Sequence, residues 1–180
     1  MAQKGQIVEI PANSPLYKEF PPRFTSRKQE LLFRSRVPHY TLFDGFLVGE
    51  HQGLSGFQLG QRKGINVGGK NAPLFVIGFD ITENRLFVGE GEAHPGLFTR
   101  TFAFHAAQFK WYRDIPFQAQ HADHGLSVEI QTSFNSKIIP AKLFLFEDQI
   151  FIDFDRKVCR KLQNQFFGIY RNQILLADLI

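Results

Sequence analysis

Short apolar runs separated by polar turns dominate the chain from residue 73 onward. The segments "PLFVIGFDI" and "RLFVGEG" flank the polar residues "TEN", a pattern that predicts a β-hairpin. In "LSVEIQTSF", Leu126, Val128, Ile130 and Phe134 alternate with polar residues, as expected for a half-buried strand. This part of the chain is therefore predicted to consist of strands.

Two further hairpins are predicted near the C-terminus. "AKLFLF" and "QIFIDF" are joined by a turn at Glu147 and Asp148, and "QFFGIY" and "QILLADLI" by a turn at Arg171 and Asn172. Hairpins that join into one closed or nearly closed sheet leave few exposed strand edges. We therefore predict a small antiparallel barrel over residues 100–180.

The first 36 residues follow a different pattern, because prolines interrupt any regular element before "TSRKQELLFRSRV". These prolines are Pro11, Pro15, Pro21 and Pro22. Ser26 followed by Gln29 fits a helix capping box, and Leu31 and Leu32 form a short apolar stripe, so one short helix is predicted there. The rest of this helix carries four cations against Glu30 alone, which fits a solvated face as well as a binding face.

The composition favours a mainly β protein with an anionic partner. The 180 residues allow one domain or two small ones, and the 21 phenylalanines require a core built largely of aromatic rings, which suit strands. The net charge of +4 and the pI of about 9.3 favour anionic partners. No apolar run approaches the roughly 20 residues of a membrane span, and the N-terminus lacks a secretion signal, so we expect a cytoplasmic location and no membrane partner.

Cys159 is the only cysteine, which excludes an internal disulfide and a cysteine-based zinc site. We expect it to be a buried residue of the barrel. His121, Asp123 and His124 have metal-compatible side chains, but ligands so close together rarely complete a tetrahedral site. A solvated loop is the favoured interpretation there, and no metal is predicted.

The segment "LGQRKGINVGG" places Gln61, Arg62 and Lys63 between Gly60 and Gly64. Glycine-rich turns can point several backbone amides at one anionic oxygen, and neighbouring cations add charge. A Walker-type nucleotide loop is excluded, because Lys63 is followed by glycine and isoleucine, which offer no hydroxyl to a metal ion. The pattern also lacks the parallel βαβ unit of a dinucleotide site, so no cofactor is predicted.

An ordered series of motifs surrounds this segment. The motifs are "VGEHQGLSGFQLGQRKGINVGG", "PLFVIGFDITENRLFVGEGEAHPGLF" and "FKWYRDIPF", followed more faintly by "TSFNSKIIPAKL" and "QFFGIYRNQILLADLI". The matching positions are Gly49 to Leu54, Leu59 to Gly64, Gly68, Gly69, Val88, Gly89, Gly91, His94, Pro95 and Trp111. Over about residues 38–180, the chain resembles the C-terminal half of the tRNA-specific 2-thiouridylases.

The resemblance implies a small α+β central domain followed by an antiparallel β-barrel similar to the second domain of translation elongation factors. In that family these parts help to hold tRNA, while an N-terminal ATP pyrophosphatase domain adenylates the wobble uridine and a pair of cysteines delivers sulfur. The Ser-Gly-Gly-x-Asp-Ser loop of that N-terminal domain does not occur in this sequence, and Cys159 lies where the family keeps no catalytic thiol. No catalytic residue is therefore assigned.

Three segments depart from the family pattern. Ser133 stands where the family usually has an arginine, and Gln163 and Asn164 replace a usual Pro-Gly. The terminal glycine-rich strand has become "LLADLI". These changes argue against contact between the barrel and tRNA.

Arg62 and Lys63 are the first candidates for contact with an RNA backbone, because flanking glycines let the main chain approach phosphates that the cations then neutralise. A turn that exposes two solvated charges is the alternative. Gln61 can bond a base or close the turn, while His51 and Gln52 can contact RNA or satisfy backbone amides.

Lys110 and Arg113 form a second candidate group with Trp111 and Tyr112, because cations that alternate with aromatic rings can stack on bases. Strand geometry would turn Trp111 to the core and Lys110 to the solvent. The full candidate set is Gln61, Arg62, Lys63, Gly60, Gly64, His51, Gln52, Lys110 and Arg113.

We divide the chain into an N-terminal extension with a short basic helix (1–36), a thiouridylase-like central domain (37–99) and a C-terminal β-barrel (100–180). The preferred hypothesis is a non-catalytic module that binds tRNA or another structured RNA in tRNA modification. One alternative is half of a split tRNA thiouridylase that acts with a separate ATP pyrophosphatase subunit, which predicts an exposed apolar patch near Leu54 and Phe57. The other is a protein-interaction domain that has lost RNA binding.

Overall fold

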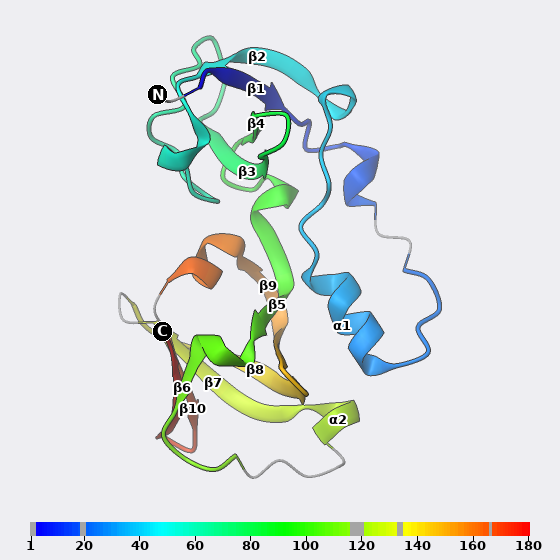
Figure 1. Cartoon of the computed structure of the whole chain (residues 1–180), viewed down its shortest axis with the longest axis vertical. Coiled ribbons are helices and arrows are strands. Elements are labelled where there is room, and N and C mark those ends of the chain that lie inside the picture. Colours follow the sequence, from blue (N-terminus) through cyan, green and yellow to red (C-terminus); the bar gives the residue numbers. More distant parts are fainter. Residues whose placement is uncertain (1–2, 19–20, 116–120, 133–134, 166) are drawn as a thin grey trace. The chain divides into compact units, whose positions relative to one another are not determined.

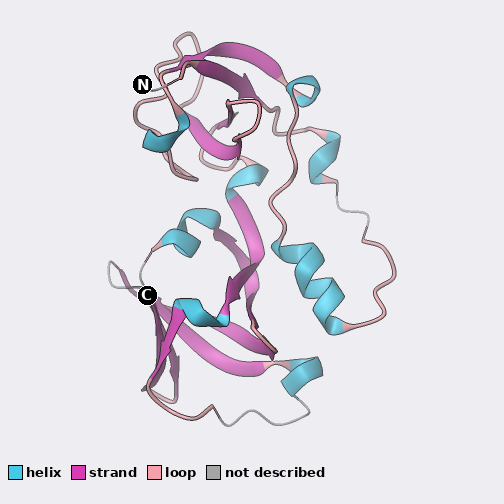
Figure 2. Ribbon diagram, viewed as in Figure 1, coloured by secondary structure: helices cyan, strands magenta, loops and turns pink. Residues whose placement is uncertain are grey.

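The computed structural model describes residues 3–18, 21–115, 121–132, 135–165 and 167–180, and it is mainly β (Figures 1 and 2). The chain forms two compact units. The central unit consists of Met1–Phe20, Val37–Phe98 and Cys159–Lys161, and the barrel unit of Pro21–Arg36, Thr99–Val158 and Leu162–Ile180. The first 36 residues, predicted to be one extension, are thus divided between the two units.

The central unit is built on a four-stranded mixed sheet in the order β2–β1–β4–β3. The strands are β1 (Gly5–Glu9), β2 (Phe46–His51), β3 (Leu74–Asp80) and β4 (Arg85–Glu90). β1 is parallel to β4 and antiparallel to β2, and β3 and β4 form the predicted hairpin. The helical elements of the described part of this unit are four 3₁₀ turns: η1 (Pro15–Tyr17), η2 (Leu42–Asp44), η3 (Leu54–Gly56) and η4 (Pro95–Leu97).

The expectation that no regular element precedes the first helix is wrong, because β1 lies between β2 and β4 in the sheet. Its segment "GQIVE" ends before the first proline and is therefore free to pair on both sides. Ile7 and Val8 are both fully buried, but they belong to different hydrophobic clusters. Since successive side chains of a strand point to opposite faces, β1 contributes to a core on each face of the sheet.

The barrel unit contains a curled seven-stranded sheet in the order β5–β9–β8–β7–β10–β11–β6. Its strands are β5 (Phe98–His105), β6 (Phe109–Trp111), β7 (Leu126–Thr132), β8 (Asn135–Phe146), β9 (Gln149–Cys159), β10 (Phe167–Arg171) and β11 (Ile174–Leu179). The hairpins β8–β9 and β10–β11 confirm both C-terminal predictions, and β7 shows the predicted alternation, although Phe134 lies outside the described residues. The last turn is centred on Asn172 and Gln173, one position later than predicted, because these two residues adopt positive φ angles.

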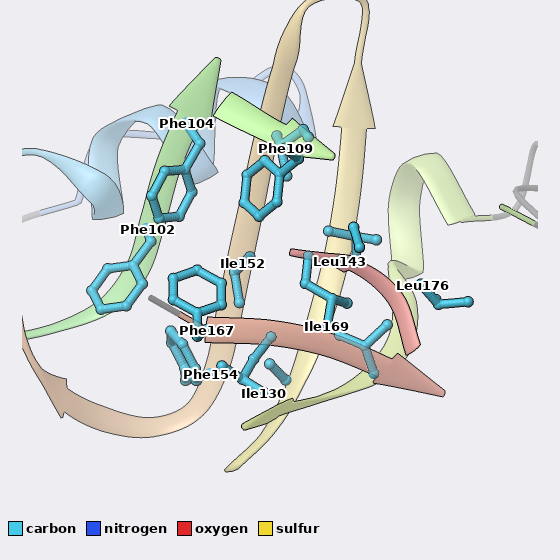
Figure 3. Close-up of a cluster of buried hydrophobic side chains, with 14 of the residues drawn as sticks. Phe102, Phe104, Phe109, Ile130, Leu143, Ile152, Phe154, Phe167, Ile169 and Leu176 are labelled. Carbon is cyan, nitrogen blue, oxygen red and sulfur yellow. The ribbon is translucent and has the colours of Figure 1, made fainter. Parts of the chain in front are cut away.

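Aromatic rings fill the interior of the curled sheet, as the phenylalanine content predicts (Figure 3). Phe102 contacts Phe154 edge to face, with ring centroids 5.1 Å apart. Phe104 contacts both Phe109 and Phe167, at centroid distances of 5.2 and 5.8 Å. Such pairs stabilise the core beyond the burial of their surface.

The predicted basic helix is α1 (Arg27–Ser35). The Ser26 hydroxyl accepts a hydrogen bond from the Gln29 amide at 3.3 Å, as in a capping box. The return bond differs from the prediction, because the Gln29 side chain accepts from the amide of Thr25, at 3.1 Å, and not from that of Ser26. Leu31 is fully buried against Phe144 and Phe151, so α1 is anchored on the barrel unit.

The cations of α1 contact acidic residues of the same unit. Arg27 bonds Asp153 of β9 at 3.0 Å and Glu30 at 2.6 Å, and Arg34 reaches Asp153 at 3.4 Å. The Asp153 carboxylate also accepts from the Thr101 hydroxyl at 2.7 Å. Arg27 and Arg34 are therefore paired with acidic residues inside the barrel unit. Neither a solvated face nor a binding face of the helix predicts this pairing.

The remaining elements are short. They are η5 (Ala106–Gln108), α2 (His121–His124) and η6 (Arg160–Asn164). Among the described residues, every helix is too short or too polar to cross a membrane.

Candidate nucleic-acid interface

The glycine-flanked triplet lies in a turn that is fixed to strand β3. The Gly60 amide donates to the carbonyl of Val76 at 2.7 Å, and the Val76 amide donates to the carbonyl of Gln61 at 2.9 Å. Gly60 and Gly64 adopt φ angles of +76° and +86°, which side-chain-bearing residues rarely adopt. The two glycines therefore determine the path of the backbone before and after the triplet.

The side chain of Gln61 closes this turn. Its amide oxygen accepts from the backbone amide of Gln58 at 3.0 Å, and its amide nitrogen donates to the carbonyl of Lys63 at 2.8 Å. Of the two roles considered for Gln61, the structure therefore favours the closing of the turn. The bonds hold the chain on both sides of Arg62.

Arg62 and Lys63 project from the turn into solvent. Within the described part of the chain, neither side chain has an ion pair or a hydrogen bond. The next apolar residue, Ile65, is only 4% exposed and packs in a cluster with Leu74 and Leu86. The turn thus presents two cations that are not neutralised by the described residues, on a backbone anchored at both ends.

His51 is an interior residue with structural bonds. It is 3% exposed, its Nδ1 accepts from the Gly53 amide at 3.0 Å, and its Nε2 donates to the carbonyl of Asn84 at 3.2 Å. Both ring nitrogens are therefore occupied, whereas the neighbouring Gln52 is exposed. The geometry favours a structural role for His51 over contact with RNA.

His94 fixes a loop in the same way. Its Nδ1 accepts from the Gly96 amide at 3.2 Å and its Nε2 donates to the carbonyl of Ile10 at 2.9 Å. Burial lowers the pKa of the His94 imidazole, so the neutral ring that these two bonds require is favoured in the folded chain. The arrangement agrees with the loop-fixing role expected from the sequence.

The second candidate group lies in the barrel unit and includes Lys110 and Arg113, both exposed. Trp111 packs against the core, as predicted, and with Tyr112, Arg113 and Asp114 it lines a shallow depression. The ammonium of Lys110 lies 5.2 Å from the centroid of the Tyr112 ring, whose hydroxyl donates to Asp178 at 3.1 Å. The cation and the ring are therefore already paired with each other.

Lys161 is a neighbour of the triplet that the sequence does not reveal. A Cβ atom on Gly60 would stand 3.1 Å from the Cβ and 3.6 Å from the Cδ of Lys161, so the lysine stem lies directly over this glycine. Both residues belong to the central unit. They are about a hundred positions apart, and no local pattern indicates such a contact.

Two other expectations are corrected or qualified by the structure. Cys159 is exposed and not buried, because it follows the buried Val158 on β9 and successive side chains of a strand point to opposite faces. His121 and His124 lie in the single turn α2, and the described residues contain no cluster of three or more possible metal ligands.

The exposed apolar surface of the central unit is not where it was expected. Leu54 and Phe57 pack against the core of that unit. Instead, Phe43, Phe46 and Leu47 are 96%, 66% and 58% exposed. They lie in and before β2, which is an edge strand of the sheet.

Residues 35–90 match the family model of the tRNA methyl transferase PRC-barrel domain. A tRNA-specific 2-thiouridylase of Christiangramia forsetii is 34% identical over 178 residues, which cover 98% of this chain and 44% of the relative. The corresponding protein of Flavobacterium johnsoniae is 30% identical over 176 residues, with the same coverage of 98% and 44%. In a 2-thiouridylase of Neisseria meningitidis, 46% of 66 residues are identical, over 37% of this chain and 18% of the relative.

The chain spans less than half the length of the first two relatives. The match nevertheless extends over both units, from the sheet of the central unit to the last hairpin of the barrel unit. The chain therefore belongs to the tRNA-specific 2-thiouridylase family and corresponds to the C-terminal part of its members.

Proposed function

We propose that this chain is an RNA-binding module in tRNA modification, with tRNA as its expected ligand. The observation that carries the proposal is the anchored turn that exposes Arg62 and Lys63, in a chain whose relatives are named as tRNA-specific 2-thiouridylases. The ligand contact is electrostatic: the two cations neutralise phosphates of the RNA backbone and release counterions.

The anchoring of the turn favours this role energetically. Ordering a flexible loop on binding costs about 0.5–1.5 kcal/mol for each immobilised side chain, in addition to the cost of fixing the backbone. The Gln61 bonds and the two contacts with Val76 fix the backbone before any ligand arrives. Only the side chains of Arg62 and Lys63 then remain to be ordered.

The module is proposed to have no catalytic activity alone. Sulfur transfer by a pair of cysteines requires two thiols, whereas this chain contains Cys159 alone. Because one thiol is missing, thiolation of tRNA is to be tested only together with a second polypeptide.

The double variant Arg62→Ala/Lys63→Ala is expected to weaken tRNA binding and to reduce its salt dependence. The slope of log K against log salt concentration should fall by about 0.7–0.9 for each phosphate contact that is lost. Binding of an unmodified tRNA transcript, followed by fluorescence anisotropy at several salt concentrations, measures both quantities.

A matched control is Lys4→Ala/Lys18→Ala, which removes the same charge from exposed positions of the same unit. This control should keep the wild-type slope to within a few tenths. An unchanged slope in the Arg62/Lys63 variant, or an equal fall in the control, would exclude the turn as the RNA contact.

A second candidate function is one half of a two-part thiouridylase, and it is favoured by the exposed edge of β2. Phe43 is 96% exposed although η2 is fixed by a capping box, in which the amide and the hydroxyl of Thr41 both donate to Asp44 at 2.7 Å. Phe46 and Leu47 of the edge strand β2 add exposed apolar surface close by in the chain. Such surfaces commonly mark protein interfaces, and a polypeptide with the ATP pyrophosphatase part of the family is the proposed partner.

The triple variant Phe43→Ser/Phe46→Ser/Leu47→Ser is expected to abolish co-elution with that partner. The partner to be used is the part of the Christiangramia forsetii 2-thiouridylase that this chain does not match. Ile81→Ser is the control, because Ile81 is 86% exposed in the same unit but lies in the β3–β4 turn. If the wild-type chain does not co-elute, or if both variants behave alike, this second candidate is wrong.

A further inference from the structure

Lys161 has the features of a ligand contact. Its side chain is exposed, and among the residues described it forms no ion pair and no hydrogen bond. Its aliphatic stem covers Gly60, with the Cβ, Cγ and Cδ atoms all 3.1 to 3.7 Å from the position of a Cβ on that glycine. The stem is therefore held in place while the ammonium group remains available.

The contact brings a third cation to the triplet. Gly60 and Arg62 are two residues apart, so their Cα atoms lie within about 7.6 Å of each other. A lysine stem that starts over Gly60 can extend over a comparable distance. The ammonium of Lys161 can therefore reach the part of the central unit that exposes Arg62 and Lys63.

The residue before Lys161 explains why this lysine stays at the turn. Arg160 is only 6% exposed and belongs to the central unit, where it lies near Tyr17 and Tyr40. These two tyrosines bond each other, with a distance of 3.1 Å between their hydroxyl oxygens. Because Arg160 is buried in the central unit, the next residue along the chain, Lys161, is held at that unit as well.

We propose that Lys161 completes the phosphate-binding surface of the Gly60–Gly64 turn, so that the RNA backbone is bound by three cations from two distant segments. This inference rests on the proposed RNA-binding function and adds a residue and a geometric requirement to it. The requirement is the glycine at position 60, because any side chain there would displace the lysine stem as well as strain a backbone with φ of +76°.

The test is Lys161→Ala in the full chain, with binding of an unmodified tRNA transcript measured over a range of salt concentrations. The variant is expected to reduce the slope of log K against log salt concentration by about 0.7–0.9, the share of one phosphate. Lys161→Arg should retain the wild-type slope, because it keeps the charge. Since Lys161 is exposed, Lys161→Ala should fold as the wild type does.

The control is Lys157→Ala, which removes one exposed lysine from β9 in the barrel unit, four residues before Lys161. If Lys161→Ala keeps the wild-type slope, or if its slope falls no further than that of Lys157→Ala, Lys161 is not a phosphate contact. That result leaves the proposed function intact, provided that the wild-type chain binds tRNA and that Arg62→Ala/Lys63→Ala weakens this binding. If the wild-type chain does not bind tRNA in dilute salt, the proposed function fails and this inference fails with it.

Discussion

Replacing Phe167 by alanine is expected to lower the free energy of unfolding of the barrel unit by about 3–5 kcal/mol. Phe167 is fully buried, and its ring contacts Phe104 and Phe109 at centroid distances of 5.8 and 6.1 Å. Alanine would remove the transfer energy of the ring and leave a cavity among other large aromatic groups that cannot collapse into it. In Figure 3 Phe167 lies between Phe102 and Ile152, so its loss affects contacts among several strands of the curled sheet.

Urea unfolding followed by tryptophan fluorescence measures this effect selectively. Trp111 is the only tryptophan and packs against the same core, so its emission reports on the barrel unit. Phe43→Ala is the control, because a ring that is 96% exposed should change stability by no more than about 0.5 kcal/mol. Equal midpoints for the two variants would contradict the description of this core.

Replacing Asp153 by alanine is expected to destabilise the barrel unit by about 2–4 kcal/mol. Asp153 is buried in β9 and bonds Arg27, Arg34 and Thr101. Removing one partner of a buried ion pair typically costs about 3–5 kcal/mol, because the other charge remains unpaired. We expect a smaller loss of stability here, because the two arginine side chains are partly exposed and water screens their charges.

The same fluorescence assay tests this prediction against Asp155→Ala. Asp155 is on the same strand, two residues further on, and is exposed, so its loss should be nearly neutral. The Asp153 variant should also release α1, which amide hydrogen exchange of residues 27–35 would detect as a loss of protection. A neutral Asp153 variant would mean that Arg27 and Arg34 are held by Glu30 alone.

The hairpins could be predicted from the sequence because each depends on neighbouring residues. Two apolar runs and the turn between them specify β3–β4, β8–β9 and β10–β11 without reference to the rest of the chain. The N-cap of α1 at Ser26 is local in the same sense. Where the prediction depended only on composition and turn chemistry, it was therefore largely right.

The missed features all depend on contacts between distant segments. β1 forms because "QIVE" pairs with a strand some 80 residues further on, and no neighbouring segment indicates this pairing. Cys159 was expected in the barrel interior, but it is the exposed last residue of β9 and belongs, with Arg160 and Lys161, to the central unit. The four cations of the predicted basic helix suggested either solvent or a ligand, and only the position of Asp153 shows that Arg27 and Arg34 bond to it.

In the candidate site, too, local features could be predicted from the sequence and a contact between distant segments could not. The glycines and the exposure of Arg62 and Lys63 are consequences of local sequence, and Gln61 was correctly considered as a residue that closes the turn. The contact of Lys161 with Gly60 is not local, and only the fold brings it about.

The alternation of the two units along the chain has a consequence for dissecting the protein. A fragment that ends at Phe98 would contain Leu31 without the rings of Phe144 and Phe151 that cover it, and would lack Arg160. The complementary fragment would contain Asp153 without its arginines. No single cleavage therefore separates the two units, and a fusion partner inserted at the apparent border near Phe98 would part segments that pack against each other.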